Sequence, residues 1–273
     1  MSRYSWRTLV LEIALWLIAI AVFAVPAAVL VNTAFKPVTE LSSGLTPPTS
    51  PTLANFETAW IDGDFPRAFL SSAVVTIVSV TLIVVLSALA AYPLARSSRR
   101  WSKTVFVAFM AGLIVPQVGV IPLYITMRDL GLVGTLPALI IIYVGAGMPF
   151  NIFLYTIFIR SMPREYEEAA VLDGCGPFRT FWSVVFPLLR PVTGTIVILA
   201  VITVYNDFYI PLLYLAGTES STLPLALRSY SSQYASNWNA TFAGLIFVTI
   251  PVLAFYLVLQ KRIIRGFAGG LKG

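Results

Sequence analysis

Long charge-free stretches alternate with short polar segments along the whole chain. An α-helix needs about 20 predominantly apolar residues to cross a bilayer, and in lipid its backbone must be hydrogen-bonded internally. Continuous runs of this length differ from the short alternating segments of membrane β-barrels. The pattern therefore predicts an all-α integral membrane protein with six transmembrane helices, which lie within Ile13–Phe35, Ala68–Ala95, Thr104–Met127, Leu130–Ile159, Pro191–Thr218 and Ser229–Gln260.

The first stretch could instead be a cleaved signal peptide. It is longer than the 7–15 apolar residues of such a peptide, and the segment Val31–Lys36 at its far end is not typical of a cleavage site. We favour a retained helix over a signal peptide.

The composition supports a membrane environment and excludes several kinds of chemistry. Of 273 residues, 58% are hydrophobic and only 11% are charged, less than half of the roughly 25% usual in soluble domains. The absence of His excludes an imidazole base or imidazole metal ligand, and a single Cys175 excludes an internal disulfide or a multi-thiolate site. We expect neither a catalytic residue nor a metal site.

The distribution of Lys and Arg predicts the orientation in the membrane. With six spans both termini lie on one side, and that side carries fourteen of these residues against four on the other. Because positive residues accumulate on the cytoplasmic side, we expect both termini to be cytoplasmic. The net charge of +6 is then a consequence of topology and does not indicate nucleic-acid binding.

Two longer polar segments are expected on the outer side. Lys36–Arg67 is rich in Pro, Ser and Thr, which predicts a mostly irregular loop. Gly217–Ala240 carries Tyr230, Tyr234 and Trp238, which form either an aromatic belt at the membrane interface or contacts for an external partner.

A few polar residues interrupt the predicted spans, where every span also carries proline. They include Gln117, Asn151 and the pair Asn206–Asp207. A carboxylate at membrane depth is costly, so it usually faces a cavity or a polar partner. Tyr205 and Tyr209 are four residues apart and would lie on one helical face. Asp207 beside them could contact a polyhydroxylated ligand or could equally have a structural role near Pro211.

The segment between the fourth and fifth spans has a distinct pattern. Pro163 and three glutamates favour the start of a short helix, which Gly174 can end in a left-handed conformation. Pro177 can open a second helix with an apolar stripe of Phe178, Phe181, Trp182 and Val185. From the residues alone, the first of these helices could dock in a groove of a partner protein or could equally be a solvent-exposed helix of a loop.

The spacing in this segment resembles the EAA loop of ATP-binding-cassette (ABC) importer permeases. Glu168-Ala169-Ala170 is followed after three residues by Gly174, and after nine more by Val184, one residue and Phe186-Pro187, where the family has Ile and Leu for Val and Phe. Tyr205–Phe208 and the Gly-rich tail that ends in Lys272-Gly273 are similar to elements of the carbohydrate branch, especially its maltose-type second permease.

The resemblance implies a type I importer permease fold with three parts: an N-terminal helix and outer loop at 1–67, a transmembrane domain at 68–262 with the coupling loop at 160–190, and a cytoplasmic tail at 263–273. It implies contacts to an ATPase subunit from Glu165, Glu168, Ala169, Ala170, Asp173 and Gly174, and tail contacts from Gly269, Gly270 and Lys272. Our candidate residues for the sugar path are Asn206, Asp207 and Tyr209.

The function that this implies is uptake of a sugar, most simply a di- or oligosaccharide, across a bacterial or archaeal plasma membrane. The partners would be a second permease, two ATPase subunits that bind ATP and Mg²⁺, an external sugar-binding protein and membrane lipid. The chain has no Gly-x4-Gly-Lys-Ser/Thr phosphate loop, so we expect it to bind no cofactor and to be no enzyme itself.

Other functions remain open from the residues alone. A permease for a non-sugar solute such as a glycerol phosphate would share these features. An ion-coupled secondary transporter would need ionisable groups within the membrane and internal repeats, whereas the spans contain only Asp207 and no repeat is evident. A membrane scaffold that recruits cytoplasmic proteins is a third alternative.

Overall fold

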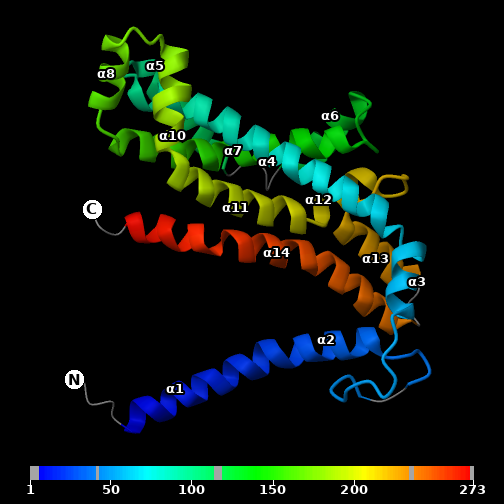
Figure 1. Ribbon diagram of the computed structural model, residues 1–273. Coiled ribbons are helices and arrows are strands. Elements are labelled where there is room, and N and C mark those ends of the chain that lie inside the picture. The colour runs from blue at the N-terminus through cyan, green and yellow to red at the C-terminus, as the bar shows by residue number, and fades with distance from the viewer. Residues whose placement is uncertain (1–5, 41–42, 114–118, 234–236, 271–273) are drawn as a thin grey trace. The chain divides into compact units, whose positions relative to one another are not determined.

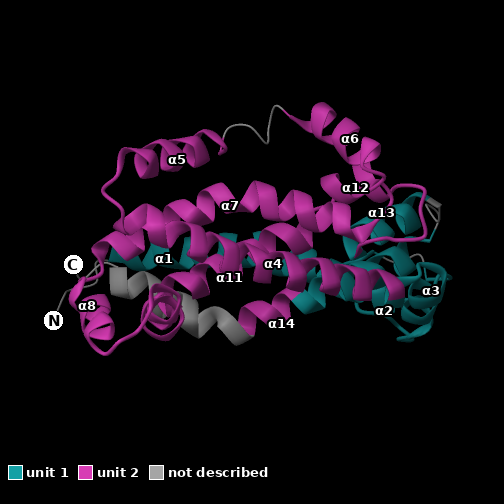
Figure 2. Ribbon diagram, turned by 90° about the horizontal axis from the view of Figure 1, so that it is seen from above, with its two compact units in different colours: residues 1–66, 223–251 teal, residues 67–222, 252–273 magenta. Residues whose placement is uncertain are grey.

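The computed structural model describes residues 6–40, 43–113, 119–233 and 237–270, with the backbone alone for 7, 233 and 258–270. All regular structure in these residues is helical (Figure 1). Two compact units, shown in teal and magenta in Figure 2, divide the chain into residues 1–66 with 223–251 and residues 67–222 with 252–273.

The second unit, residues 67–222 and 252–273, contains the predicted coupling loop. Within it α7 contacts α5, α11 and α12, and α8 contacts η3 and α9. The helices of the unit are α4 (Phe65–Arg96), α5 (Arg100–Ala111), α6 (Val120–Asp129), α7 (Leu136–Ser161), α8 (Glu165–Leu172), α9 (Pro177–Thr180), the π-helical turn η3 (Phe181–Val185), α10 (Phe186–Leu188), α11 (Arg190–Asn206), α12 (Tyr209–Leu215) and the second part of α14 (Trp238–Gly270).

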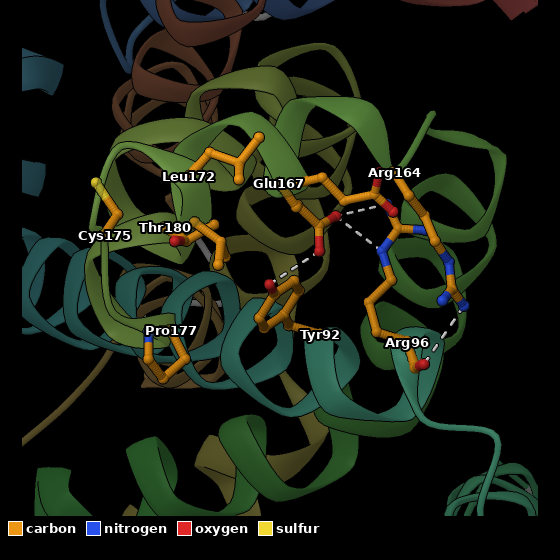
Figure 3. A pocket seen from close by; sticks show the side chains of 10 residues that line it. Tyr92, Arg96, Arg164, Glu167, Leu172, Cys175, Pro177 and Thr180 are labelled. Atoms are coloured by element: carbon orange, nitrogen blue, oxygen red, sulfur yellow. Dashed lines mark hydrogen bonds and ion pairs between the residues drawn. The ribbon is translucent and has the colours of Figure 1, made fainter.

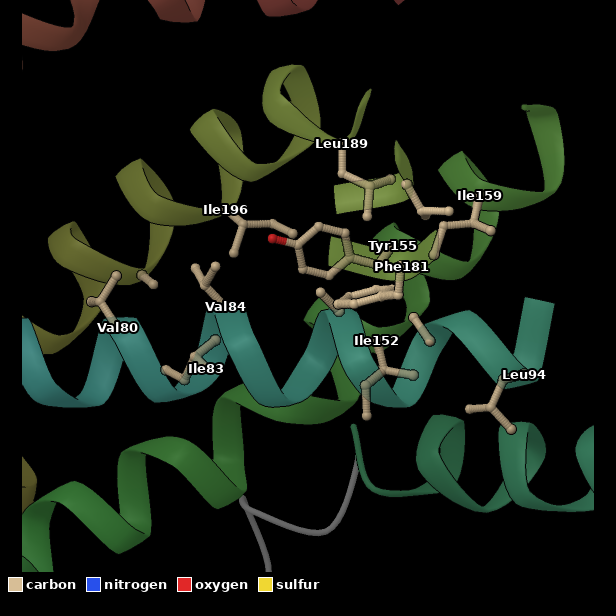
Figure 4. Packing of buried hydrophobic residues seen from close by; sticks show 14 residues of the cluster. Val80, Ile83, Val84, Leu94, Ile152, Tyr155, Ile159, Phe181, Leu189 and Ile196 are labelled. Atoms are coloured by element: carbon tan, nitrogen blue, oxygen red, sulfur yellow. The ribbon is translucent and has the colours of Figure 1, made fainter. Parts of the chain in front are cut away.

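The core of this unit joins the spans to the segment that follows α8 (Figure 4). Tyr155 of α7 lies at its centre and is fully buried, and its hydroxyl donates a hydrogen bond to Thr193 Oγ1 of α11 at 2.9 Å. Phe181 and Val185 of η3 pack into the same cluster as Ile152 of α7. The residues after α8 are therefore anchored in the core of the spans.

The first unit, residues 1–66 and 223–251, contains the predicted outer segments. It includes α1 (Trp6–Ala19), the π-helical turn η1 (Ile20–Ala24), α2 (Val25–Phe35), α3 (Ala54–Asp62), α13 (Leu223–Gln233) and the first part of α14 (Trp238–Gly270). The loop predicted to be mostly irregular contains the helix α3, which the sequence analysis did not anticipate.

A buried lysine organises the chain after α2. Lys36 is 2% exposed, and its Nζ donates to Ser43 O at 2.6 Å and to Thr46 Oγ1 at 3.0 Å. The carbonyl of Lys36 accepts hydrogen bonds from the side-chain amides of Asn55 at 2.6 Å and Asn239 at 2.8 Å. Polar contacts thus hold α3 and the start of α14 to the end of α2.

Four of the six predicted spans are single helices of sufficient length and hydropathy to cross a membrane. They are Thr8–Phe35, Phe65–Arg96, Leu136–Ser161 and Trp238–Leu257. The last begins at Trp238 and not at Ser229, because Ser229 belongs to the separate helix α13.

The third and fifth predicted spans differ from the prediction. The third falls on the short helices α5 and α6, and Pro116 and Gln117 lie outside the described residues. The fifth is broken, because α11 ends at Asn206 and Asp207 adopts an extended backbone conformation before α12 begins. A bent pair, Pro177–Leu188 with Arg190–Asn206 at 75°, forms a further candidate span.

Candidate functional site

The predicted coupling helix is present as α8, and it ends as the sequence predicted. Gly174 has a φ of +80°, and its amide donates to Val171 O at 3.0 Å, while the Cys175 amide donates to Ala170 O at 2.9 Å. These two bonds form a Schellman motif, in which a left-handed glycine lets the chain turn sharply after the helix. Pro163 lies before the helix and not in its first turn, because α8 begins at Glu165.

Most of the residues predicted to contact an ATPase subunit are at the surface. Glu165, Glu168, Ala169 and Asp173 are exposed. Ala170 is 6% exposed and is the only buried residue of α8, all of which is described. Ala170 therefore faces the rest of the unit, whereas the other predicted contact residues of α8 and its C-terminal turn face outward.

Exposed apolar side chains accompany these acidic residues, a feature that sequence reasoning missed. Leu172 is 89% exposed, Val171 61% and Tyr166 53%. Phe178 on α9, which belongs to the predicted apolar stripe, is 70% exposed, whereas Phe181 and Val185 of that stripe are buried. We call Tyr166, Glu168, Val171, Leu172 and Phe178 the α8 surface.

A polar network beneath α8 connects it to the end of α4 (Figure 3). Glu167 Oε1 accepts a hydrogen bond from Arg96 Nε at 2.8 Å and forms an ion pair with Arg96 Nη2 at 2.6 Å. Glu167 Oε2 accepts a hydrogen bond from the Tyr92 hydroxyl at 2.9 Å. The network lines an open hollow of about 650 Å³ together with Arg164 and Cys175. Neither Tyr92 nor Arg96 was a predicted site residue, because 71 residues separate Arg96 from Glu167.

The geometry around Asp207 favours the structural alternative. Its Oδ1 accepts a hydrogen bond from the Tyr209 amide at 2.9 Å, which caps the start of α12, and its Oδ2 accepts one from the Tyr143 hydroxyl of α7 at 2.8 Å. The prediction that Tyr205 and Tyr209 share a helical face is wrong, because the helix breaks between them. Tyr205 is 8% exposed and Tyr209 is 53% exposed.

The remaining predicted residues are placed as follows. The side-chain amide of Asn206 donates to Ile202 O of its own helix at 3.0 Å, and Asn151 does the same to Gly147 O at 2.8 Å. Gly269 and Gly270 are the last residues of α14, whereas Lys272 and Tyr234 lie outside the described residues. Within the described chain, no three Cys, Asp or Glu residues gather where they could hold a metal ion.

A chain of apolar spans with an exposed helix between two of them is also found in a known protein family. Residues 83–269 match the family model of the binding-protein-dependent transport system inner membrane component. The chain belongs to this family. The predicted resemblance to ABC importer permeases is thereby confirmed, and the chain is a multi-pass protein of the plasma membrane.

Individual relatives match nearly the whole chain. The melibiose/raffinose/stachyose import permease MelC of Bacillus subtilis is 34% identical over 248 residues, covering 90% of each chain. The multiple sugar-binding transport system permease MsmG of Streptococcus mutans is 34% identical over 274 residues, covering 98% of this chain and 96% of the relative. A probable permease for starch degradation products, AmyC of Thermoanaerobacterium thermosulfurigenes, is 33% identical over 244 residues, covering 89% and 88%.

The fold is also found in a solved structure. The crystal structure of a bacterial ABC transporter that imports the acidic polysaccharide alginate matches with a TM-score of 0.82 and 23% identity, over 96% of this chain and 99% of that one. The predicted type I importer permease fold is confirmed by this match and by the family model.

Proposed function

We propose that this chain is the permease subunit of an ATP-driven uptake system for a di- or oligosaccharide and forms half of a heterodimeric path through the membrane. Support for a sugar comes from the relatives, whose names specify melibiose, raffinose and stachyose, starch degradation products, and diacetylchitobiose. Asn206, Asp207 and Tyr209 stay candidate residues of the sugar path.

The α8 surface is the observation that carries the coupling part of this proposal. It combines an exposed carboxylate, Glu168, with apolar side chains as exposed as Leu172 at 89%. Such side chains lose contact with water when a protein partner covers them, which favours association. The helix α8 enters a groove of an ATPase subunit, with Glu165, Ala169, Asp173 and Gly174 at the contact.

The other partners follow from this assignment. Two ATPase subunits bind and hydrolyse ATP with Mg²⁺, because this chain carries no phosphate loop of its own. A second permease completes the path, and an external binding protein delivers the sugar to the outer side. The charge distribution favours cytoplasmic termini, with α8 and the tail residues Gly269, Gly270 and Lys272 facing the ATPase subunits.

Uptake by the reconstituted complex tests the function. Proteoliposomes that contain this chain, its partner permease and the ATPase subunits should import the sugar only when ATP is inside and the loaded binding protein is outside. Omission of the ATPase subunits is the matched control. Uptake that persists without ATPase subunits, driven by an ion gradient, would refute the proposal.

The sugar itself can be identified on the binding protein. A ligand that binds only the folded state raises the temperature of unfolding by mass action. We expect a di- or oligosaccharide to give the largest shift in a panel that also contains monosaccharides and glycerol 3-phosphate. The largest shift with glycerol 3-phosphate would refute the sugar assignment.

A further inference from the structure

One carboxylate in the first turn of α8 faces the protein interior. Glu165 and Glu168 are exposed, whereas the side chain of Glu167 is only 14% exposed. The side chain of its ion-pair partner Arg96 is also 14% exposed. An acidic first turn is favourable for any helix, because it faces the positive end of the helix dipole. The dipole does not explain why Glu167 is turned away from water and directed at α4.

Both partners of Glu167 lie on the last turns of α4. Tyr92 and Arg96 are four residues apart, which places them on one face of the helix. Their hydroxyl and guanidinium groups occupy both oxygens of the same carboxylate. Charge-assisted hydrogen bonds of this kind are shorter and roughly twice as strong as neutral ones, and they fix the relative orientation of the two groups.

The end of α4 also contacts the chain before and after α8. Arg96 Nη2 donates to Met162 O at 3.2 Å, and Arg164 Nη2 approaches Arg96 O at 3.5 Å. The Tyr92 ring packs on the Phe181 ring of η3, with their centroids 5.4 Å apart. The end of α4 is thereby attached to the loop at three successive places.

Apolar burial of its own residues holds α8 only weakly. A helix of eight residues is too short to be stable alone, and Ala170 is its only buried residue, all eight being described. A single buried methyl group contributes little apolar burial compared with a large side chain. The polar contacts of Glu167 therefore provide the specific link that fixes α8 relative to the end of α4.

We propose that the Arg96–Glu167 pair is the link through which movement of α8 is transmitted to the span α4, with Arg96 as a positioning residue for coupling. This inference rests on the proposed function, in which α8 is carried by an ATPase subunit. When the pair is broken, α8 moves with its ATPase subunit but α4 follows incompletely, so ATP is hydrolysed without a full change of access.

The test uses the complete complex in proteoliposomes, with the Arg96→Gln and Glu167→Gln variants and the exchange Arg96→Glu with Glu167→Arg. Arg99→Gln is the matched control, because it removes an exposed positive charge three residues after Arg96 and leaves the Arg96–Glu167 pair intact. The amount of assembled complex and the number of sugar molecules imported per ATP are measured for each variant.

We expect each single variant to import about tenfold fewer sugar molecules per ATP, an effect in the range seen for directly coupled side chains. The exchange should restore a large part of the ratio, and Arg99→Gln should leave it unchanged. If the pair has only a structural role, the variants will yield less complex, but the complex that assembles will import as many sugar molecules per ATP as wild type. This result would overturn the proposal.

Failure of the underlying function has a different signature. If wild-type complex neither imports sugar nor responds to the binding protein, both proposals fall. If wild-type complex is coupled and the single variants are coupled equally well, only the role of Arg96 and Glu167 is refuted.

Discussion

The Tyr143 hydroxyl of α7 donates a hydrogen bond to Asp207 Oδ2 at 2.8 Å, at the break between α11 and α12. A hydrogen bond to a charged group contributes roughly 1.5–3 kcal/mol, so Tyr143→Phe should lower the free energy of unfolding by about this amount. Asp207→Asn should destabilise the chain similarly, because it removes the charge that Tyr143 and the Tyr209 amide share. The unfolding temperature in detergent measures both effects.

Tyr209→Phe is the matched control for this prediction. The Tyr209 backbone amide contacts Asp207, while its side chain is 53% exposed, so the loss of its hydroxyl should leave stability unchanged. If Asp207→Asn is as stable as wild type but takes up sugar with a raised KM, Asp207 contacts sugar and the structural assignment is wrong.

Asp207 also shows what the sequence pattern could and could not predict. The length of the apolar stretch Pro191–Thr218 predicts one continuous span, with Asp207 as an interruption. In the structure the Asp207 side chain accepts a hydrogen bond from the Tyr209 amide at the start of a new helix. An Asp four residues before Pro211 is a recognisable helix start, so this break had a local signal. The length criterion for spans concealed it.

The local structure of the predicted coupling loop could be predicted from the sequence because its signals are local. The acidic first turn, the left-handed Gly174 and the start of α9 at Pro177 depend on neighbouring residues only. The partners of Glu167 depend on how α4 packs against the loop, 71 residues away from Arg96, and no local pattern encodes this contact. The exposure of Phe178 likewise depends on where η3 enters the core.

Gly174→Ala should impair coupling through the backbone. A Cβ at this position meets no atom within 4 Å, so the effect cannot come from a clash. At a φ of +80°, however, an alanine is strained by roughly 1–2 kcal/mol, which favours a different exit from α8. We expect sugar uptake to fall severalfold, with normal insertion into the membrane.

Gly176→Ala provides the control for the glycine prediction. Gly176 also has open space around its Cβ position, but its φ is −71°, which alanine adopts readily. Uptake by Gly176→Ala should equal that of wild type. Equal loss of uptake in both variants would contradict a specific role of the turn at Gly174.

In the segments predicted to lie on the outer side, the contacts of Lys36 should contribute more to stability than the ion pair of Arg67. Lys36 is 2% exposed and donates to Ser43 O and Thr46 Oγ1, so Lys36→Met should lower stability by roughly 1.5–3 kcal/mol and speed proteolysis between residues 37 and 53. The Arg67–Glu219 pair is 56% and 86% exposed at its side chains, so Arg67→Met should change proteolysis little. Equal protease sensitivity of the two variants would contradict this ranking.

The orientation can be tested by cysteine labelling in a Cys175→Ser background. Both Ser232 and Leu172 are exposed positions, so each can be replaced by cysteine and reached by a membrane-impermeant reagent. In cells that produce this chain without the ATPase subunits, we expect Ser232→Cys to react when the cells are intact and Leu172→Cys only after the membrane is opened. Reaction of Leu172→Cys in intact cells would contradict cytoplasmic termini.

In the proposed function the α8 surface couples ATP hydrolysis to movement of the spans. Its exposed residues can be replaced without disturbing the fold. Glu168→Lys reverses an exposed charge, and Leu172→Asp introduces a charge at a side chain that is 89% exposed. Ser98→Asp adds the same charge at an exposed position outside α8 and is the matched control.

The most direct measurement is the ATPase activity of the reconstituted complex with and without the sugar-loaded binding protein. We expect strong stimulation in wild type and Ser98→Asp, and loss of that stimulation in Glu168→Lys and Leu172→Asp, whereas membrane insertion and the sugar affinity of the binding protein stay normal. Wild-type stimulation and uptake in both α8 variants would show that this helix is not the coupling element.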